Sequence, residues 1–278
     1  MQDLRELSME KDNLPDASLT SNQLQKYAED LAKVYQSERE KSKDLEAANQ
    51  QLLKYADDLN KTVLELKEAY LDTIHRLALA AEYKDEDTGE HIIRMSRYCA
   101  LIAEKLGLPA EEVKNILYAS PMHDIGKIGI PDTILMKTGK LTEEEFEIMK
   151  THTIIGANLL AHSRAEILQV AEQIAISHHE KWNGTGYPKG LSDDQIPLVG
   201  RIAGLADVFD ALTSRRPYKE PYPIEKACEI IKKERGKHFD PDVVDVFMEN
   251  IDEILKIKEE VGSADNALRS GFARSGRD

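Results

Sequence analysis

The sequence predicts an all-α protein in which a long coiled-coil helix precedes a globular bundle of helices. Leucines recur every seven residues over 20–75, which is the spacing of a coiled-coil seam. From about residue 70 onward the apolar residues follow helical spacing, and no stretch alternates convincingly over a strand length. We therefore expect a linker or disordered segment at 1–19, the coiled coil at 20–75, the globular domain at 76–261 and a disordered tail at 262–278.

The coiled coil has one heptad position filled almost entirely by leucine. Its members are Leu24, Leu31, Leu45, Leu52, Leu59 and Leu66, and Glu38 is the one interruption. The second core position is filled in part by Tyr27, Val34, Ala48 and Tyr55. Two arrangements fit this pattern: a single amphipathic helix lying on its own domain, or a parallel homodimer. We favour the homodimer, because nothing else in the segment needs a chemical role.

The expected helices of the globular domain follow in chain order. Thr88 can cap a helix that carries His91 and ends near Gly107. Thr142, with Glu145 three residues later, forms a capping box for a helix that runs through His152. Further helices are expected near 110–121, 164–180, 198–213, 223–235 and 240–258.

Composition and charge exclude several classes of protein. The net charge of −14 argues against a broad surface for binding nucleic-acid polymers. No apolar run approaches the ~20 residues that a membrane helix needs, and the first residues lack the apolar core of a secretion signal. Cys99 and Cys228 are too few for a disulfide framework and are expected to be reduced core thiols. We expect a cytoplasmic protein that does not insert into membranes.

Five of the eight histidines lie in strongly patterned segments together with two aspartates. These residues are His91, His123, Asp124, His152, His178, His179 and Asp207. Imidazole and carboxylate groups suit a hydrolytic metal site, and an adjacent histidine and aspartate can bridge two ions. The other three histidines, His75, His162 and His238, are expected to be ordinary surface or core residues.

The patterned segments resemble, in the same order, the motifs of the HD-GYP family, a branch of the HD-domain metal phosphohydrolases. The matching segments are DTGEH at 87–91, HDIGKIGIPD at 123–132, KTHTIIG at 150–156, HHEKWNGTGYP at 178–188, and ADVFDALT at 206–213 with RPYK at 216–219. The resemblance covers residues 70–258 and implies an HD-domain helical bundle, with the catalytic domain over 76–261.

The resemblance implies hydrolysis of the bacterial second messenger cyclic di-GMP, to linear pGpG and/or GMP, by a bridging hydroxide in a site of two or three metals. His91, His123, Asp124 and Asp207 would hold one metal, and Asp124, His152, His178 and His179 the other. With Asp124 shared, each ion has four protein bonds and keeps open positions for catalysis. Ligands without sulfur favour iron or manganese over a structural zinc.

Asp87 departs from the pattern of three-metal members of the family, which carry glutamate at this position. Aspartate is shorter by one methylene, so its carboxylate could fall short of a third ion or reach it only through water. The alternative role for Asp87 is that of an acid at a helix N-terminus, stabilised by the helix dipole.

The resemblance also indicates the residues that would contact substrate. Lys127 could bind a phosphate oxygen or protonate the leaving group, so it is a catalytic candidate together with Asp124, unless it is an ordinary solvated lysine. Arg216 and Lys219 would hold phosphate.

The loop at 184–188 is the other expected contact with substrate. Gly186 would leave room for a nucleotide beside the backbone, and Tyr187 would stack on a guanine or form a hydrogen bond to it. The glycines also suit an ordinary loop. The family implicates this loop in contacts with diguanylate cyclase domains. Asp210 and Thr213 would support the ligands or the helix packing.

Two other functions remain open from the sequence. The chain could be a non-catalytic scaffold that binds a cyclic dinucleotide and signals through the coiled coil. It could also carry a different HD-domain chemistry, either hydrolysis of another nucleotide or oxidation at a di-iron centre. No residue separates cyclic di-GMP from a mixed guanine–adenine ring.

Overall fold

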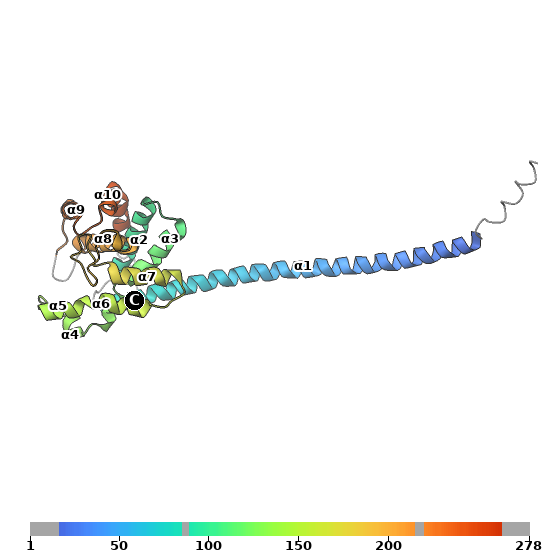
Figure 1. Cartoon of the computed structure of the whole chain (residues 1–278), viewed down its shortest axis with the longest axis horizontal. Helices are drawn as coiled ribbons and strands as arrows, with labels where there is room; N and C mark the ends of the chain where they lie inside the picture. The colour runs from blue at the N-terminus through green and yellow to red at the C-terminus, as the bar shows by residue number, and fades with distance from the viewer. Residues whose placement is uncertain (1–16, 85–88, 215–219, 263–278) are drawn as a thin grey trace, which may run out of the picture. The chain divides into compact units, whose positions relative to one another are not determined.

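The computed structural model describes residues 17–84, 89–214 and 220–262, and these residues are built from helices (Figure 1). Across the described ranges there is no β-strand, only two isolated bridges between loops. The predicted all-α class is therefore confirmed. None of the described helices is both long and apolar enough to cross a membrane.

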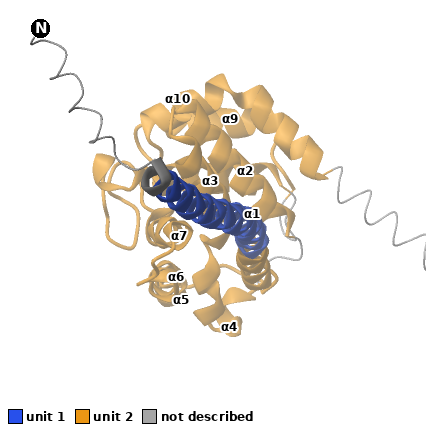
Figure 2. Cartoon of the chain, turned by 90° about the vertical axis from the view of Figure 1, so that its right-hand side faces the viewer, with its two compact units in different colours: residues 1–68 blue, residues 69–278 orange. Residues whose placement is uncertain are grey.

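The chain divides into two compact units, residues 1–68 and 69–278 (Figure 2). Helix α1, Ala17–Glu82, provides the described part of the first unit and confirms the predicted long N-terminal helix. The seam leucines are largely exposed, from 63% for Leu52 to 70% for Leu31. At the interruption of the seam, Lys41 forms an ion pair with Glu38 at 3.3 Å.

The second unit is a bundle around one main core. After the last turns of α1 it contains α2 (Glu90–Lys105), α3 (Ala110–Ala119), α4 (Asp132–Leu135), α5 (Glu143–Lys150), α6 (His152–Leu160), α7 (Glu166–Ser177), α8 (Leu198–Thr213), α9 (Ile224–Lys233), α10 (Pro241–Glu249) and a helix over 251–262. Short 3₁₀ turns lie at η2 (Ser120–Met122), η3 (Ile125–Gly129) and η4 (Asp193–Gln195).

The core lies where α2, α3, α7 and α8 pack against one another. Tyr98 of α2, Phe209 of α8 and Phe247 of α10 are fully buried, and their rings meet edge to face, with centroids 5.7 Å and 5.0 Å apart. Ile74 and Ala78, from the last turns of α1, are buried in the same core. Burial of this apolar surface holds the loops that carry the candidate site.

Local breaks shorten or divide three of the predicted helices. Helix α3 ends at Ala119, because Pro121 lies in a 3₁₀ turn that follows it. The capping box of Thr142 and Glu145 is confirmed, but the helix that it begins stops at Lys150, and His152 starts a new one. A break at Asn250 likewise divides the helix predicted over 240–258.

Side chains at two of these breaks bond to the backbone of the preceding turn. Thr151 donates from its hydroxyl to the carbonyl oxygen of Ile148 at 2.6 Å. Asn250 donates from its side-chain amide to the carbonyl oxygen of Val246 at 2.8 Å. Such local bonds compete with continuation of the helix. The predicted cap Thr88 lies outside the described residues.

Candidate metal centre

The predicted ligands come from five segments that meet at the ends of helices. His91 is the second residue of α2, and His123 and Asp124 lie between η2 and η3. The first residue of α6 is His152, whereas His178 and His179 follow the last residue of α7. Asp207 lies in the second half of α8. The fold brings these seven residues into two neighbouring groups.

Gly126 lets the segment that carries His123 and Asp124 approach α6 closely. A Cβ at this position would lie 1.9 Å from the carbonyl oxygen of His152 and 2.4 Å from the amide nitrogen of Gly156. Both neighbours are backbone atoms, which cannot move aside cheaply. Glycine at this position therefore permits the close approach of the segment that carries Asp124 to the start of α6.

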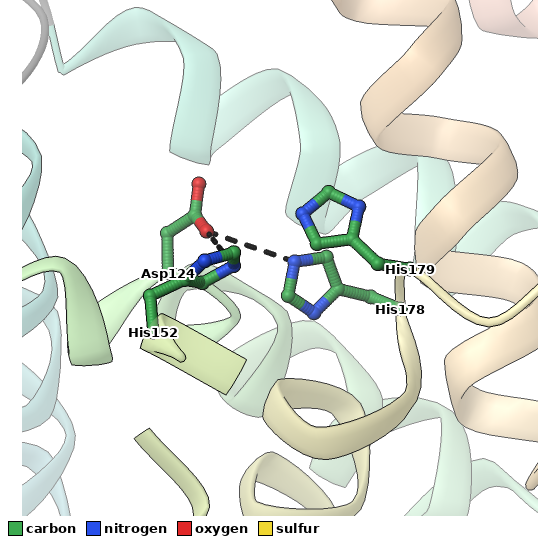
Figure 3. Close-up of side chains that lie close together, drawn as sticks. All are labelled: Asp124, His152, His178 and His179. Atoms are coloured by element: carbon green, nitrogen blue, oxygen red, sulfur yellow. Dashed lines mark ion pairs between the residues drawn. The ribbon is translucent and has the colours of Figure 1, made fainter. Parts of the chain in front are cut away.

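The first group consists of Asp124, His152, His178 and His179, whose candidate ligand atoms all lie within 4.8 Å of one another. Oδ1 of Asp124 lies 3.2 Å from Nε2 of His152 and 3.6 Å from Nε2 of His178 (Figure 3). In the close-up the aspartate and the three imidazoles face a common space. This geometry suits a cation bound by three imidazoles and one carboxylate oxygen.

The second group consists of His91, His123 and Asp207, with candidate ligand atoms again within 4.8 Å of one another. Nε2 of His91 lies 3.5 Å from Oδ1 of Asp207. Nε2 of His123 lies 3.1 Å from Oδ2 of Asp124. Asp124 thus presents one carboxylate oxygen to each group, as a residue that bridges two cations must do.

Buried polar atoms without hydrogen bonds test whether the residues fit a metal. Among the described residues, Nε2 of His123, His152 and His178 and Oδ1 of Asp124 are buried and make no hydrogen bond. A buried polar atom without a partner costs roughly 1–3 kcal/mol. The three imidazole nitrogens all lie around the carboxylate of Asp124, at 3.1–3.6 Å from its oxygens. Divalent cations would satisfy all four atoms, so the donor set fits a metal centre.

Backbone carbonyls orient three of the imidazoles. Nδ1 of His123 lies 3.0 Å from the carbonyl oxygen of Ser120, Nδ1 of His152 lies 2.7 Å from that of Met149, and Nδ1 of His178 lies 3.0 Å from that of Ile174. A carbonyl accepts only, so each Nδ1 carries the proton. In the neutral form of each ring, Nε2 then directs its lone pair into the site.

Burial and neighbouring charges shift the pKa values of the ligands in different directions. Burial, together with neighbouring positive histidines, lowers the pKa of His179 well below its usual range and that of His152 to about 4. Burial also acts on His123, but the facing carboxylate of Asp124 outweighs it and raises the pKa of His123 to about 9. His152 and His179 are therefore neutral at pH 7, the form that binds metals.

A second carboxylate and an arginine support His91. Nδ1 of His91 lies 2.8 Å from Oδ2 of Asp210, and Arg94 donates to both oxygens of that carboxylate, at 2.7 and 2.9 Å. Burial opposes ionisation of Asp210, but these donors hold its pKa far below the usual range. The sequence indicated Asp210 but not Arg94. The available signal for Arg94 was its position one helical turn after His91.

Lys127 contacts the aspartate that lies between the two groups of candidate ligands. Its ammonium lies 2.8 Å from Oδ2 of Asp124, and 19% of its side chain is exposed. The turn that carries it is held by Lys84, whose ammonium donates to the carbonyl oxygens of Ile128 and Ile130 at 3.0 and 2.9 Å. Sequence reasoning missed Lys84, because nothing in its local pattern points to a turn more than forty residues away.

The GTGYP loop, residues 184–188, lies against the first group of candidate ligands. Glu180 is buried and accepts hydrogen bonds from the backbone amides of Lys189 and Leu191, at 2.7 and 3.0 Å. A Cβ at Gly186 would lie 2.3 Å from the amide nitrogen of Lys181, so the loop folds back closely on itself. Tyr187 consequently packs on His179, with ring centroids 4.8 Å apart.

Three predicted site residues, Asp87, Arg216 and Lys219, lie outside the described residues. The described neighbour of the last two is Ser214, which follows α8. Its hydroxyl accepts hydrogen bonds from Arg94 at 3.1 Å and from Lys258 at 3.2 Å. Ser214, the last described residue before this gap, thereby contacts the arginine that supports His91.

Comparison with known proteins places this site in a family. The model of the HD domain family matches residues 72–243. A cyclic di-GMP phosphodiesterase of Thermotoga maritima is 44% identical over 207 residues, which cover 74% of this chain and 56% of that protein. A 3′3′-cGAMP-specific phosphodiesterase of Vibrio cholerae is 42% identical over 196 residues, which cover 70% of this chain and 38% of that protein.

Other relatives agree with these matches. A cyclic di-GMP phosphodiesterase response regulator of Xanthomonas campestris is 48% identical over 184 residues, which cover 66% of this chain and 49% of that protein. The chain thus spans about half the length of the curated relatives it matches. The crystal structure of a cyclic GMP-AMP-specific phosphodiesterase of V. cholerae shares the fold, with a TM-score of 0.53 at 24% identity, covering 72% of this chain and 52% of that chain. The chain belongs to the HD domain family, which confirms the resemblance inferred from its motifs.

Proposed function

We propose that the chain is a metal-dependent phosphodiesterase that hydrolyses cyclic di-GMP to linear pGpG and/or GMP. The observation that carries this proposal is the position of Asp124, one oxygen of which faces each group of histidines. A centre with one shared carboxylate suits in-line displacement at a phosphodiester. Relatives named as cyclic di-GMP phosphodiesterases, 44% and 48% identical, support the choice of substrate.

The ligands are assigned to two cations. His91, His123, Asp124 and Asp207 hold one, and Asp124, His152, His178 and His179 the other. Iron or manganese suits this set of imidazole and carboxylate ligands, and Asp87 is the proposed ligand of a third ion. When bound, the cations would lower the pKa of a water molecule and neutralise the oxygens of the phosphodiester.

Lys127 has the position of a general acid or a phosphate ligand. Its ammonium lies 2.8 Å from Asp124, so a phosphodiester at the cations lies within its reach. There it would donate a hydrogen bond to a phosphate oxygen or a proton to the leaving ribose oxygen. Arg216 and Lys219 hold the second phosphate, and the backbone at Gly186 and the ring of Tyr187 face the nucleotide. The part of the chain over 76–261 forms this catalytic domain.

The partners follow from the exposed surfaces and from the substrate. The seam of exposed leucines on α1 supports a parallel homodimer through residues 20–75. The GTGYP loop is the proposed contact for diguanylate cyclase domains. Because the proposed substrate is an intracellular messenger, the protein would act in the cytoplasm.

A second candidate substrate is the mixed guanine–adenine dinucleotide, because a relative that is 42% identical is named as specific for 3′3′-cGAMP. Incubating metal-loaded protein with each cyclic dinucleotide and separating the products decides between the two. We expect faster turnover of cyclic di-GMP. A faster reaction with cGAMP would make cGAMP the substrate in place of cyclic di-GMP. No turnover of either dinucleotide would refute the enzymatic function in favour of a binding scaffold.

A further inference from the structure

Phe146 is an aromatic side chain in an exposed position beside the metal centre. It lies on α5, none of whose residues is buried, and 45% of Phe146 is exposed. Its first-turn neighbours are glutamates, and one of these, Glu145, completes the capping box. Packing in the core therefore does not account for this aromatic ring.

The ring of Phe146 continues an aromatic surface that starts at the metal ligands. Tyr187 packs on His179 with ring centroids 4.8 Å apart and an interplanar angle of 32°. Phe146 meets Tyr187 edge to face, with centroids 6.1 Å apart and an angle of 82°. The three rings thus lead from His179 to the exposed side chain of Phe146 on α5.

Lys150 adds a positive charge over this surface. Its ammonium lies 5.5 Å from the centroid of Phe146 and 5.8 Å from that of Tyr187. It pairs with Glu147 at 2.6 Å; the side chain of Lys150 is 25% exposed and that of Glu147 is 69% exposed. Because the carboxylate of this pair lies largely in solvent, the ion pair is weak and an incoming ligand can compete for the ammonium.

We propose that Phe146, Lys150 and Tyr187 form a subsite for one guanine base of the substrate, in which Lys150 selects guanine. Bases stack on aromatic rings, and the stacking is worth about the same for every base. The selection comes from Lys150, because an ammonium donates to O6 and N7 of guanine, whereas adenine presents an amino group in place of O6. This inference rests on the proposed function and adds two residues, Phe146 and Lys150, to its binding site.

The aromatic half of the subsite is tested by Phe146→Leu and Phe146→Trp in the metal-loaded full chain. Leucine keeps an apolar side chain but cannot stack, so the KM for cyclic di-GMP should rise about tenfold while kcat and metal content stay unchanged. Tryptophan keeps a stacking surface and should hold the KM near the wild-type value. Ile148→Ala, at another exposed apolar position of α5, serves as the matched control and should leave the KM unchanged.

The charged half is tested by Lys150→Met, with cyclic di-AMP as a competitor. In the wild type we expect the inhibition constant of cyclic di-AMP to lie well above the KM for cyclic di-GMP. In Lys150→Met the ratio of these two constants should fall about tenfold. An unchanged preference would overturn the role of Lys150. An unchanged KM in Phe146→Leu, in a wild type that hydrolyses cyclic di-GMP, would overturn the subsite and leave the proposed function standing. A wild type that neither binds nor hydrolyses a cyclic dinucleotide would overturn both.

Discussion

Asp210 accepts a hydrogen bond from Nδ1 of His91 at 2.8 Å, which leaves Nε2 of that ring directed at Asp207, 3.5 Å away. Arg94 holds the same carboxylate through two donors, so Asp210 cannot turn away from His91. A ligand oriented in this manner loses no ring rotation when it binds a cation. The affinity of the second group for a metal should therefore depend on Asp210, which is not itself a proposed ligand.

Asp210→Asn should weaken metal binding about 10–100-fold, because an amide accepts more weakly than a carboxylate and can present its donor to His91. Titration of the metal-free protein with Mn²⁺ measures this change. Asp245→Asn is the control, since Asp245 lies on α10, forms an exposed ion pair with Arg235 at 2.6 Å and belongs to neither group of candidate ligands. Equal affinities in Asp210→Asn and the wild type would mean that Asp210 serves only the packing of α8.

Asp124→Ala should abolish both metal binding and hydrolysis. The substitution removes one oxygen from each group of ligands, and it leaves Lys127 without the carboxylate at 2.8 Å. Metal analysis of the anaerobically purified variant, set beside its rate with cyclic di-GMP, measures the effect. A variant that retained the wild-type metal stoichiometry would disprove the shared position of Asp124.

The parts of this structure that the sequence predicted are those with a periodic or local signal. The heptad leucines predicted α1, and the capping box of Thr142 and Glu145 marked the start of α5. Chemistry-bearing residue types in patterned segments indicated the seven residues that the fold brings together. The break at Thr151 was not predicted, because a hydrogen bond from one side chain to the turn before it leaves no periodic trace.

The supporting residues were harder to find, because their partners are neighbours in space alone. Lys84 bonds to carbonyls after Lys127, and Glu180 bonds to amides that lie nine and eleven residues further on. Each is an ordinary charged residue until the packing of the helices brings its partner close. In a sequence that is 32% charged, a charged residue with a structural role cannot be distinguished from an ordinary solvated one.

His238 should make stability depend on pH in the acid range. Burial, aided by the charge of Lys181, lowers its pKa from 6.5 to about 4, and its ring stacks on Phe239 with centroids 4.3 Å apart. As the pH falls below 6.5 the unfolded chain binds a proton that the folded chain does not, so stability is lost between pH 6.5 and 4. In His238→Gln this loss should be smaller. Urea unfolding at pH 7 and pH 5 gives the comparison, and an identical loss in both proteins would assign the acid sensitivity to other groups.

Leu52→Asp should separate the proposed homodimer into monomers. Leu52 lies in the middle of the heptad seam and is 63% exposed in the single chain. Burial of a leucine stabilises by roughly 1.5–3 kcal/mol, and a dimer buries it twice, so the Kd should rise at least about a hundredfold. Gln50→Asp adds the same charge away from the seam and should leave the dimer intact, as sedimentation over a range of protein concentrations would reveal. If both variants sedimented like the wild type, the seam would not be the interface, and an amphipathic helix lying on its own domain would be the better account of residues 20–75.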